Sequence, residues 1–304
     1  MTDRFAAPVS IEEALAILAS DSASRPVAGG TDLVVASRQG RKPLPESIVA
    51  IDRITELGRH GVVDGDLVLG SLTSHAWLAS STDVRRTWTA LADASAIVGS
   101  PATRGTGTIG GNLMNASPAA ETTAPLVVLG ATVMLRAIGR GSRIVPVAKL
   151  AVGPGRTSAA LDELLTTVIV PAPPADSGSA YIRLEYRRAM EIAVVGAAAF
   201  ITLAADGSIR DARIGLTAVA PTIVRAPEAE AVLAGAPATL ETYRATGAAA
   251  AAAARPIDDV RASAAYRRAM LAVVVTRAVA AAVARARGED IPIPASRWAH
   301  GQEA

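Results

Sequence analysis

The spacing of apolar residues over the first 170 positions predicts short strands alternating with short helices. Ser10 followed by Glu13 is typical of a capped helix start, and Ile11, Leu15 and Leu18 would share one face of that helix. Strands are predicted over 25–28, 47–51, 67–70, 131–137 and 164–170, with helices starting at residue 31 and over 73–80. The N-terminal half therefore reads as an α/β arrangement.

The pattern changes after residue 172. The segment 172–179, Ala-Pro-Pro-Ala-Asp-Ser-Gly-Ser, is typical of a linker. Residues 194–204 and 212–219 then read as neighbouring strands, and a long helix is predicted over 263–287. These segments indicate a second domain with a small sheet and helices.

Residues 99–120 show no helical or strand period and are rich in Gly, Ser, Thr, Pro and Asn. We expect a long loop here, and a loop of this length inside a compact domain is usually functional.

Two glycine-rich segments, 27–33 and 105–112, are the chemical landmarks of the chain. Glycine lets the backbone approach a ligand closely, and exposed amide N–H groups hold phosphate oxygens without a basic side chain. The hydroxyls of Thr31, Thr106 and Thr108 would add donors. Two such loops suit a ligand with two phosphates, such as a dinucleotide, although Gly29-Gly30 alone also fits an ordinary turn.

Gly105, Gly107 and Gly110 satisfy the spacing of the Rossmann dinucleotide-binding fingerprint. That fingerprint follows a strand and opens a helix. Here residues 100–104 are poor strand material, and residues 115–118 disfavour a long helix. We therefore reject the Rossmann interpretation.

Composition excludes several other functions. Thirty basic residues are offset by 28 acidic ones, and only 3% of the residues are aromatic, which disfavours nucleic-acid binding. The chain has no cysteine, so it holds no disulfide and no cysteine-ligated cluster, and its three histidines lack metal-ligand spacing. We expect no metal site in this chain.

The N-terminus lacks the layout of a signal peptide, and the most apolar stretch, 192–205, is shorter than the ~20 residues of a membrane span. The expectation is a cytoplasmic protein without a membrane span.

The two glycine segments resemble those of the FAD-binding subunits of the xanthine dehydrogenase and carbon monoxide dehydrogenase family, the molybdenum hydroxylases. Residues 28–32, Ala-Gly-Gly-Thr-Asp, resemble its first flavin loop, and residues 108–112, Thr-Ile-Gly-Gly-Asn, its second. Residues 214–216, 219–222 and 266–268 extend the resemblance over most of the chain.

The resemblance implies an α+β fold: a two-subdomain FAD-binding α/β domain followed by a C-terminal domain with a small antiparallel sheet and helices. The implied boundaries are 1–175 for the FAD-binding domain, with subdomains of about 1–57 and 58–175, then 180–290 for the C-terminal domain. Residues 291–304 would form a tail.

The resemblance also implies the FAD-binding residues. They are Ala28, Gly29, Gly30, Thr31, Asp32, Thr108, Ile109, Gly110, Gly111, Asn112, Ser117, Glu121, Leu164 and Arg183.

Glu121 and Arg183 depart from the family pattern, which has Asp and Lys at these positions. Taken singly, Glu121 also fits a surface carboxylate, Leu164 a core residue and Arg183 a solvated cation at a strand end. Ile192 matches a region where relatives place a residue against the flavin, but an Ile cannot stack on the ring as an aromatic would.

The implied function is electron transfer. Substrate would be oxidised at a molybdenum cofactor on a large partner subunit, and electrons would pass through [2Fe–2S] clusters on a small iron–sulfur subunit to FAD here. We expect a dimer of heterotrimers and no catalytic side chain on this chain, because the redox chemistry belongs to the cofactor.

Two alternatives stay open at this point. One is a self-sufficient flavin-dependent oxidase or reductase, which needs its own substrate pocket with a positioned acid or base. The other is a non-catalytic nucleotide-binding or assembly subunit that has lost flavin.

Overall fold

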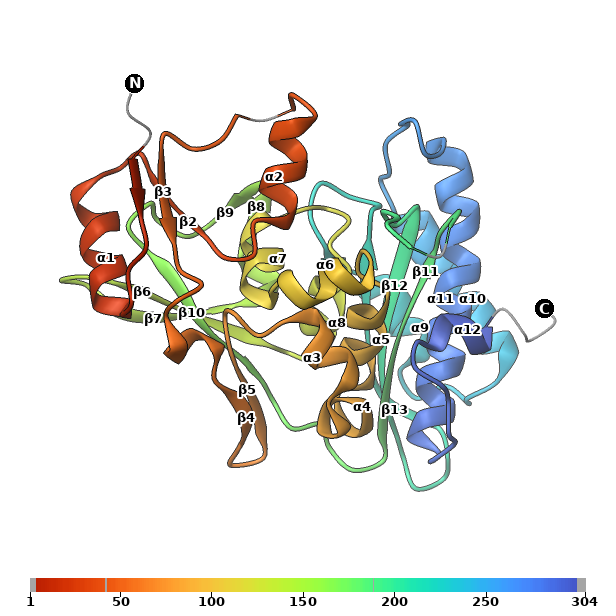
Figure 1. Ribbon diagram of the computed structural model, residues 1–304. Helices are drawn as coiled ribbons and strands as arrows, with labels where there is room; N and C mark the ends of the chain where they lie inside the picture. Colours follow the sequence, from red (N-terminus) through yellow and green to blue (C-terminus); the bar gives the residue numbers. More distant parts are fainter. Residues whose placement is uncertain (1–3, 42, 188, 300–304) are drawn as a thin grey trace.

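The computed structural model describes residues 4–41, 43–187 and 189–299, and its three larger sheets are arranged along the molecule (Figure 1). A small parallel sheet and a larger antiparallel sheet belong to the N-terminal part. The third sheet lies between the helices of the middle of the chain and the C-terminal helices. The predicted α+β fold is confirmed.

The first sheet is parallel, in the order β1-β3-β2, and is built by two β–α–β crossovers. Its elements are β1 (Arg4–Ala6), α1 (Ile11–Ser20), β2 (Ser24–Val27), α2 (Thr31–Arg38) and β3 (Ser47–Ala50). Ser10 caps α1 by accepting from the Glu13 amide, but the Glu13 carboxylate accepts from the Val9 amide, not from Ser10. The N-cap is therefore present, and the hydrogen bond to the Glu13 carboxylate that would complete a capping box comes from the residue before Ser10.

The second sheet is antiparallel, in the order β4-β5-β10-β6-β7. Its strands are β4 (His60–Val63), β5 (Asp66–Gly70), β6 (Thr132–Ala137), β7 (Gly141–Pro146) and β10 (Leu164–Val170). Short elements adjoin it: η1 (Thr55–Gly58), η2 (Val147–Lys149), β8 (Ala151–Gly153) and β9 (Arg156–Thr157). The β5–β6 connection contains α3 (His75–Ser80), α4 (Thr82–Thr87), α5 (Thr89–Ile97), α6 (Pro101–Thr106), α7 (Ile109–Asn115) and α8 (Thr123–Val128).

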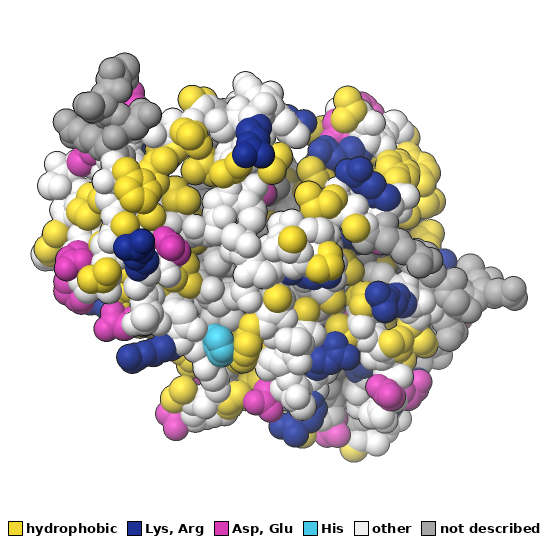
Figure 2. All heavy atoms as spheres, viewed as in Figure 1, with side chains coloured by type: hydrophobic (Ala, Val, Ile, Leu, Met, Phe, Trp, Pro, Cys, Tyr) yellow, Lys and Arg dark blue, Asp and Glu magenta, His cyan; other side chains and the backbone are white. Residues whose placement is uncertain are grey.

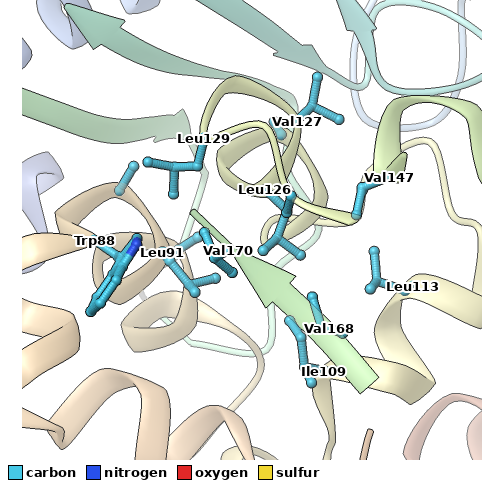
Figure 3. Packing of buried hydrophobic residues seen from close by; sticks show 14 of the residues in the cluster. Trp88, Leu91, Ile109, Leu113, Leu126, Val127, Leu129, Val147, Val168 and Val170 are labelled. Carbon is cyan, nitrogen blue, oxygen red and sulfur yellow. The ribbon is translucent and has the colours of Figure 1, made fainter. Parts of the chain in front are cut away.

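The prediction of a long loop over 99–120 is wrong, because α6 and α7 lie there. Ser100 caps α6 by accepting from the Thr103 amide, and Thr108 caps α7. Figure 3 shows Ile109 and Leu113 of α7 directed into the buried cluster that also contains Val168 of β10. Packing of these two residues and capping at both starts offset the poor helix propensity of the glycines.

The third sheet is an antiparallel meander, β11-β12-β13-β14. Its strands are β11 (Ser177–Leu184), β12 (Val195–Leu203), β13 (Ile209–Thr217) and β14 (Val224–Arg225). Every residue of β12 is buried. Ala198 and Phe200 join the core of the N-terminal part, while Ala197, Ala199 and Ile201 join the C-terminal core. A strand covered on both faces gives the nearly unbroken apolar run seen in the sequence. Because β11 begins at Ser177, the predicted linker is shorter than 172–179.

The C-terminal helices pack on the outer face of this sheet. They are α9 (Pro227–Leu233), α10 (Leu240–Ala253), α11 (Ala264–Ala286) and α12 (Ala295–Ala299). By length and composition α11 is the single helix among the described residues that could cross a membrane, yet half of its apolar window is buried inside the protein. Its contacts with β11 and β12 make it the core helix of this domain.

On the face drawn in Figure 2, Lys and Arg side chains lie in small groups separated by uncharged and hydrophobic side chains. This distribution agrees with the near balance of charges in the sequence.

Candidate functional site

The first glycine loop turns the chain from β2 into α2. Gly30 has a left-handed backbone with φ of 65°, which glycine adopts without strain, and it occupies the N-cap position without a side chain to cap the helix. Within the described part of the chain, the amide N–H groups of residues 30–33 have no acceptor. α2 itself has no buried residue. The start of α2 is thus a set of free donors at the positive end of a helix.

The second glycine loop leads into α7, and the amides of residues 109–112 are already satisfied. Ile109 donates to the Thr73 carbonyl and Gly110 to the Ser71 carbonyl, both at 2.9 Å. The Gly111 amide donates to the Thr108 hydroxyl at 3.0 Å, and the Asn112 amide donates to the Thr108 carbonyl. The prediction that this loop exposes these amides is therefore wrong.

Gly110 is required by close packing. A Cβ built at Gly110 would lie 2.6 Å from the Cβ of Ser71 and 2.7 Å from its carbonyl oxygen. α7 can therefore approach the turn after β5 only because residue 110 has no side chain.

The two glycine loops, separated by over 70 residues in sequence, are in direct contact. A Cβ on Gly29 would lie 1.9 Å from the carbonyl oxygen of Thr106. The side-chain amide of Asn115 at the end of α7 donates to the Asp32 carboxylate at 2.8 Å. These contacts at both ends make the loops a single unit.

His75 lies behind this contact. Its backbone amide donates to the Gly107 carbonyl, and its ring would be 3.3 Å from a Cβ on Gly107. The ring is buried, and Nδ1 has no hydrogen-bond partner among the described residues. Burial, with help from the nearby Arg104 guanidinium, lowers the pKa of His75 to about 4. The imidazole is therefore neutral at physiological pH.

Arg104 in α6 places positive charge beside the loops. Its guanidinium donates to the Val98 carbonyl at 3.0 Å, and no carboxylate in the described ranges pairs with it. Burial, and secondly the Arg183 guanidinium, lower its pKa from the usual value. Among the residues that the structure describes, Arg104 is thus a charge without a counter-ion, near His75 on one side and Arg183 on the other.

A neighbouring cluster consists of three charged side chains, of which Glu121 and Arg183 are buried and Glu185 is partly exposed. Arg183 is 1% exposed and pairs with the carboxylates of both Glu121 and Glu185. Burial raises the pKa of Glu121, and the guanidinium opposes that rise. Neither residue is on the surface, so the alternatives of a surface carboxylate and a solvated cation are wrong for Glu121 and Arg183.

The remaining predicted site residues have different surroundings. Ser117 accepts from the Ala119 amide at 3.2 Å in the turn before α8. The Leu164 side chain is buried in the cluster that contains Leu15 and Val49, which leaves only its backbone for a ligand. Ile192 is 43% exposed on the loop between β11 and β12.

Arg104 and Asn115 lie beside the glycine loops but are not among the site residues predicted from the sequence. Asn115 follows the second resembling segment by three residues, whereas the placement of Arg104 and His75 depends on tertiary contacts. No group of three or more His, Cys, Asp or Glu side chains in the described ranges could hold a metal ion.

Comparison with known families matches nearly the whole chain. Residues 2–173 match the family described as the FAD binding domain in molybdopterin dehydrogenase. Residues 180–282 match the family described as the CO dehydrogenase flavoprotein C-terminal domain.

Individual relatives are named as subunits of multi-subunit dehydrogenases. The carbon monoxide dehydrogenase medium chain of Afipia carboxidovorans is 34% identical over 92% of this chain and 96% of its own length. The 6-hydroxypseudooxynicotine dehydrogenase complex subunit alpha of Paenarthrobacter nicotinovorans is 32% identical over 91% of this chain and 93% of its own. Among solved structures, a chain of Hydrogenophaga pseudoflava carbon monoxide dehydrogenase superposes with a TM-score of 0.88 at 33% identity, covering 93% of this chain and 97% of that one.

Proposed function

The chain belongs to the family of FAD-binding subunits of the molybdenum hydroxylases, the xanthine and carbon monoxide dehydrogenase type, and we propose that it passes electrons from partner chains through FAD to an external acceptor. FAD supplies the ability to exchange electrons singly or in pairs. The residues of this chain bind and orient the cofactor.

The observation that carries the proposal is the contact between the two glycine loops beside unpaired donors. The amides of residues 30–33 need acceptors, and a pyrophosphate supplies them at a helix N-terminus, where its charge is also favoured. Arg104 adds an uncompensated cation nearby. In this arrangement the amides at the start of α2 would donate hydrogen bonds to the cofactor, and α7 would provide the surface against which the cofactor packs.

The proposed cofactor site comprises three groups. Residues 28–32 would bind phosphate, and residues 108–112 with Ser117 would form the second wall. Glu121, Arg183 and the backbone of Leu164 would lie near the ring system. The proposed division places this site in a FAD-binding domain of residues 1–175, with residues 180–290 as the C-terminal domain.

The chain's lack of cysteine supports a division of labour. A [2Fe–2S] cluster requires thiolate ligands, so the clusters that deliver electrons would be on a small iron–sulfur subunit. The molybdenum cofactor would be on a large subunit, where substrate is oxidised. The relatives' names as medium chain and as subunit alpha of a complex support such partners. We propose a dimer of these heterotrimers.

The test is a mild affinity purification of the tagged chain from its native host, followed by a visible spectrum, metal analysis and identification of co-eluting chains. The proposal expects flavin, molybdenum and iron with two further chains. A lone yellow protein that turns over a small molecule would instead establish the self-sufficient flavoenzyme. A colourless preparation that nevertheless contains both partner chains would show that the subunit has lost flavin.

A further inference from the structure

Arg267 in the first turn of α11 is a buried guanidinium far from both glycine loops in sequence. It is 3% exposed, and it donates through Nη1 to the carbonyls of Val194 and Ala218 and through Nη2 to the Asp259 carboxylate at 2.7 Å. Its neighbour Arg268 is exposed. Burying an arginine is costly unless its donors are used; both terminal nitrogens of Arg267 are used, while Nε has no partner among the described residues.

Val194, whose carbonyl is the first of the two acceptors of Arg267, is the last residue of the loop between β11 and β12. The same loop is held three residues earlier, where Arg183 Nη1 donates to the Glu191 carbonyl at 3.3 Å. Two buried arginines from different elements therefore fix the backbone on either side of Ile192.

This loop also rests directly on α6. The Met190 amide donates to the Gly99 carbonyl at 3.0 Å, and the Thr103 hydroxyl approaches the Met190 sulfur at 3.5 Å. Because α6 ends at Thr106, which contacts Gly29, the loop and the two glycine loops are parts of one contact network.

The second carbonyl, that of Ala218, belongs to a turn with a left-handed backbone, φ of 64°. The Ala218 amide donates to the Pro118 carbonyl at 2.8 Å. Pro118 is in the segment that contains Ser117 and Glu121. Arg267 therefore contacts Ala218, and Ala218 contacts Pro118, which lies in the segment that forms the second wall of the proposed site.

We infer that Arg267 is a positioning residue of the flavin site, which fixes residues 189–194 of the loop before β12 and the segment over 116–122 through the carbonyls of Val194 and Ala218. That the site holds flavin rests on the proposed function, whereas the two hydrogen-bonded connections from Arg267 do not. It gives the C-terminal domain a specific part in cofactor binding: its core helix sets two segments around Glu121 and Arg183.

The experiment compares R267K and R267M with R268K as the matched control, all in the full-length chain. Amide hydrogen exchange is measured over 189–194 and 116–122, and the Kd for FAD is measured in the complex purified through this chain. Lysine keeps the charge but presents all its donors from a single nitrogen, so it cannot reproduce the two-nitrogen contact with the carbonyls and Asp259, whereas methionine donates to none. We expect FAD binding weaker by about tenfold for R267K and about 100-fold for R267M, from the loss of charge-assisted hydrogen bonds. R268K should behave as wild type.

Exchange should accelerate in the two segments while β12 and the middle of α11 stay protected. Wild-type exchange in both segments, or uniform loosening of the whole C-terminal domain with unchanged FAD affinity, would overturn the inference. If R267M does not fold, Asp259→Asn keeps the arginine and weakens its ion pair, and it should give the smaller change of the same kind. A wild-type complex without flavin would remove the proposed function, and the exchange data would still decide the positioning of the two segments.

Discussion

The carboxylate of Asp93 in α5 and the guanidinium of Arg285 in α11 form a two-point ion pair, with N–O distances of 2.6 and 3.0 Å. Asp93 is fully buried and also accepts from the amides of Tyr181 and Ala295. One side chain in the N-terminal part thus binds β11, α11 and the segment after α11. This buried carboxylate therefore joins three segments of the C-terminal part to α5.

Asp93→Asn should lower the free energy of unfolding by about 3–5 kcal/mol, because it leaves the Arg285 charge buried without its partner. Urea unfolding followed by circular dichroism measures the change. Asp83→Asn is the matched control, since Asp83 pairs with Arg86 on the exposed surface and should change stability by less than about 0.5 kcal/mol. Equal effects of the two substitutions would contradict the assigned importance of the buried pair.

Gly29→Ala should abolish flavin retention in the purified complex. The new Cβ would occupy the position of the Thr106 carbonyl oxygen, so the glycine loops must separate, and overpacking of this kind costs about 1–3 kcal/mol. The ratio of flavin to protein is the measurement. Gly105→Ala, three residues before the second resembling segment, meets no atom within 4 Å and should retain full flavin content.

Thr108→Val should destabilise the protein by about 1 kcal/mol and weaken FAD binding, because α7 loses the hydroxyl that accepts from the Gly111 amide. Thr108→Ser retains the acceptor and should be close to wild type in both properties. Thermal unfolding and flavin titration distinguish the two variants. A serine variant as impaired as the valine variant would show that the methyl group, not the cap, is what matters.

His75 should make stability fall in mild acid. Its pKa is about 4 in the folded chain against about 6.5 when unfolded, so the unfolded state binds the proton first as pH decreases. The contribution is fully present above pH 6.5 and is lost as pH falls toward 4. Between pH 7 and pH 5 the loss is about 2 kcal/mol.

The check on His75 is urea unfolding at pH 7 and pH 5 for the wild type and for His75→Gln, which cannot titrate. The wild type should lose about 2 kcal/mol more than the variant between the two pH values. Parallel losses in the two proteins would mean that other groups account for the acid sensitivity.

Several elements could be predicted from the sequence because their local patterns agree with their final surroundings. The strand over 164–170 has the predicted bounds, and α11 lies within one residue of the predicted helix at each end. β12 was predicted from an apolar run, which its burial on both faces explains. In each case burial follows directly from the side chains of the segment itself.

The helices α6 and α7 could not be predicted because their sequences are poor in helix formers. They are held by caps at Ser100 and Thr108 and by burial of Ile109 and Leu113, and only the caps are local signals. The site was predicted as two loops with exposed amides. Among the described residues the amides of 30–33 have no acceptor. Those of 109–112 are satisfied, two of them by the carbonyls of Ser71 and Thr73, whose proximity is set by the tertiary fold.

The contact between Gly29 and Thr106 has a consequence for protein engineering. Each glycine loop packs directly on the backbone of the other. Exchanging one of them between related flavoproteins would therefore bring together two backbones whose shapes do not match. A chimaera that aims to change flavin affinity should therefore move residues 28–32 and 99–116 as one cassette, together with Ser71 and His75. The transferable unit of this site is a pair of segments with their supporting side chains.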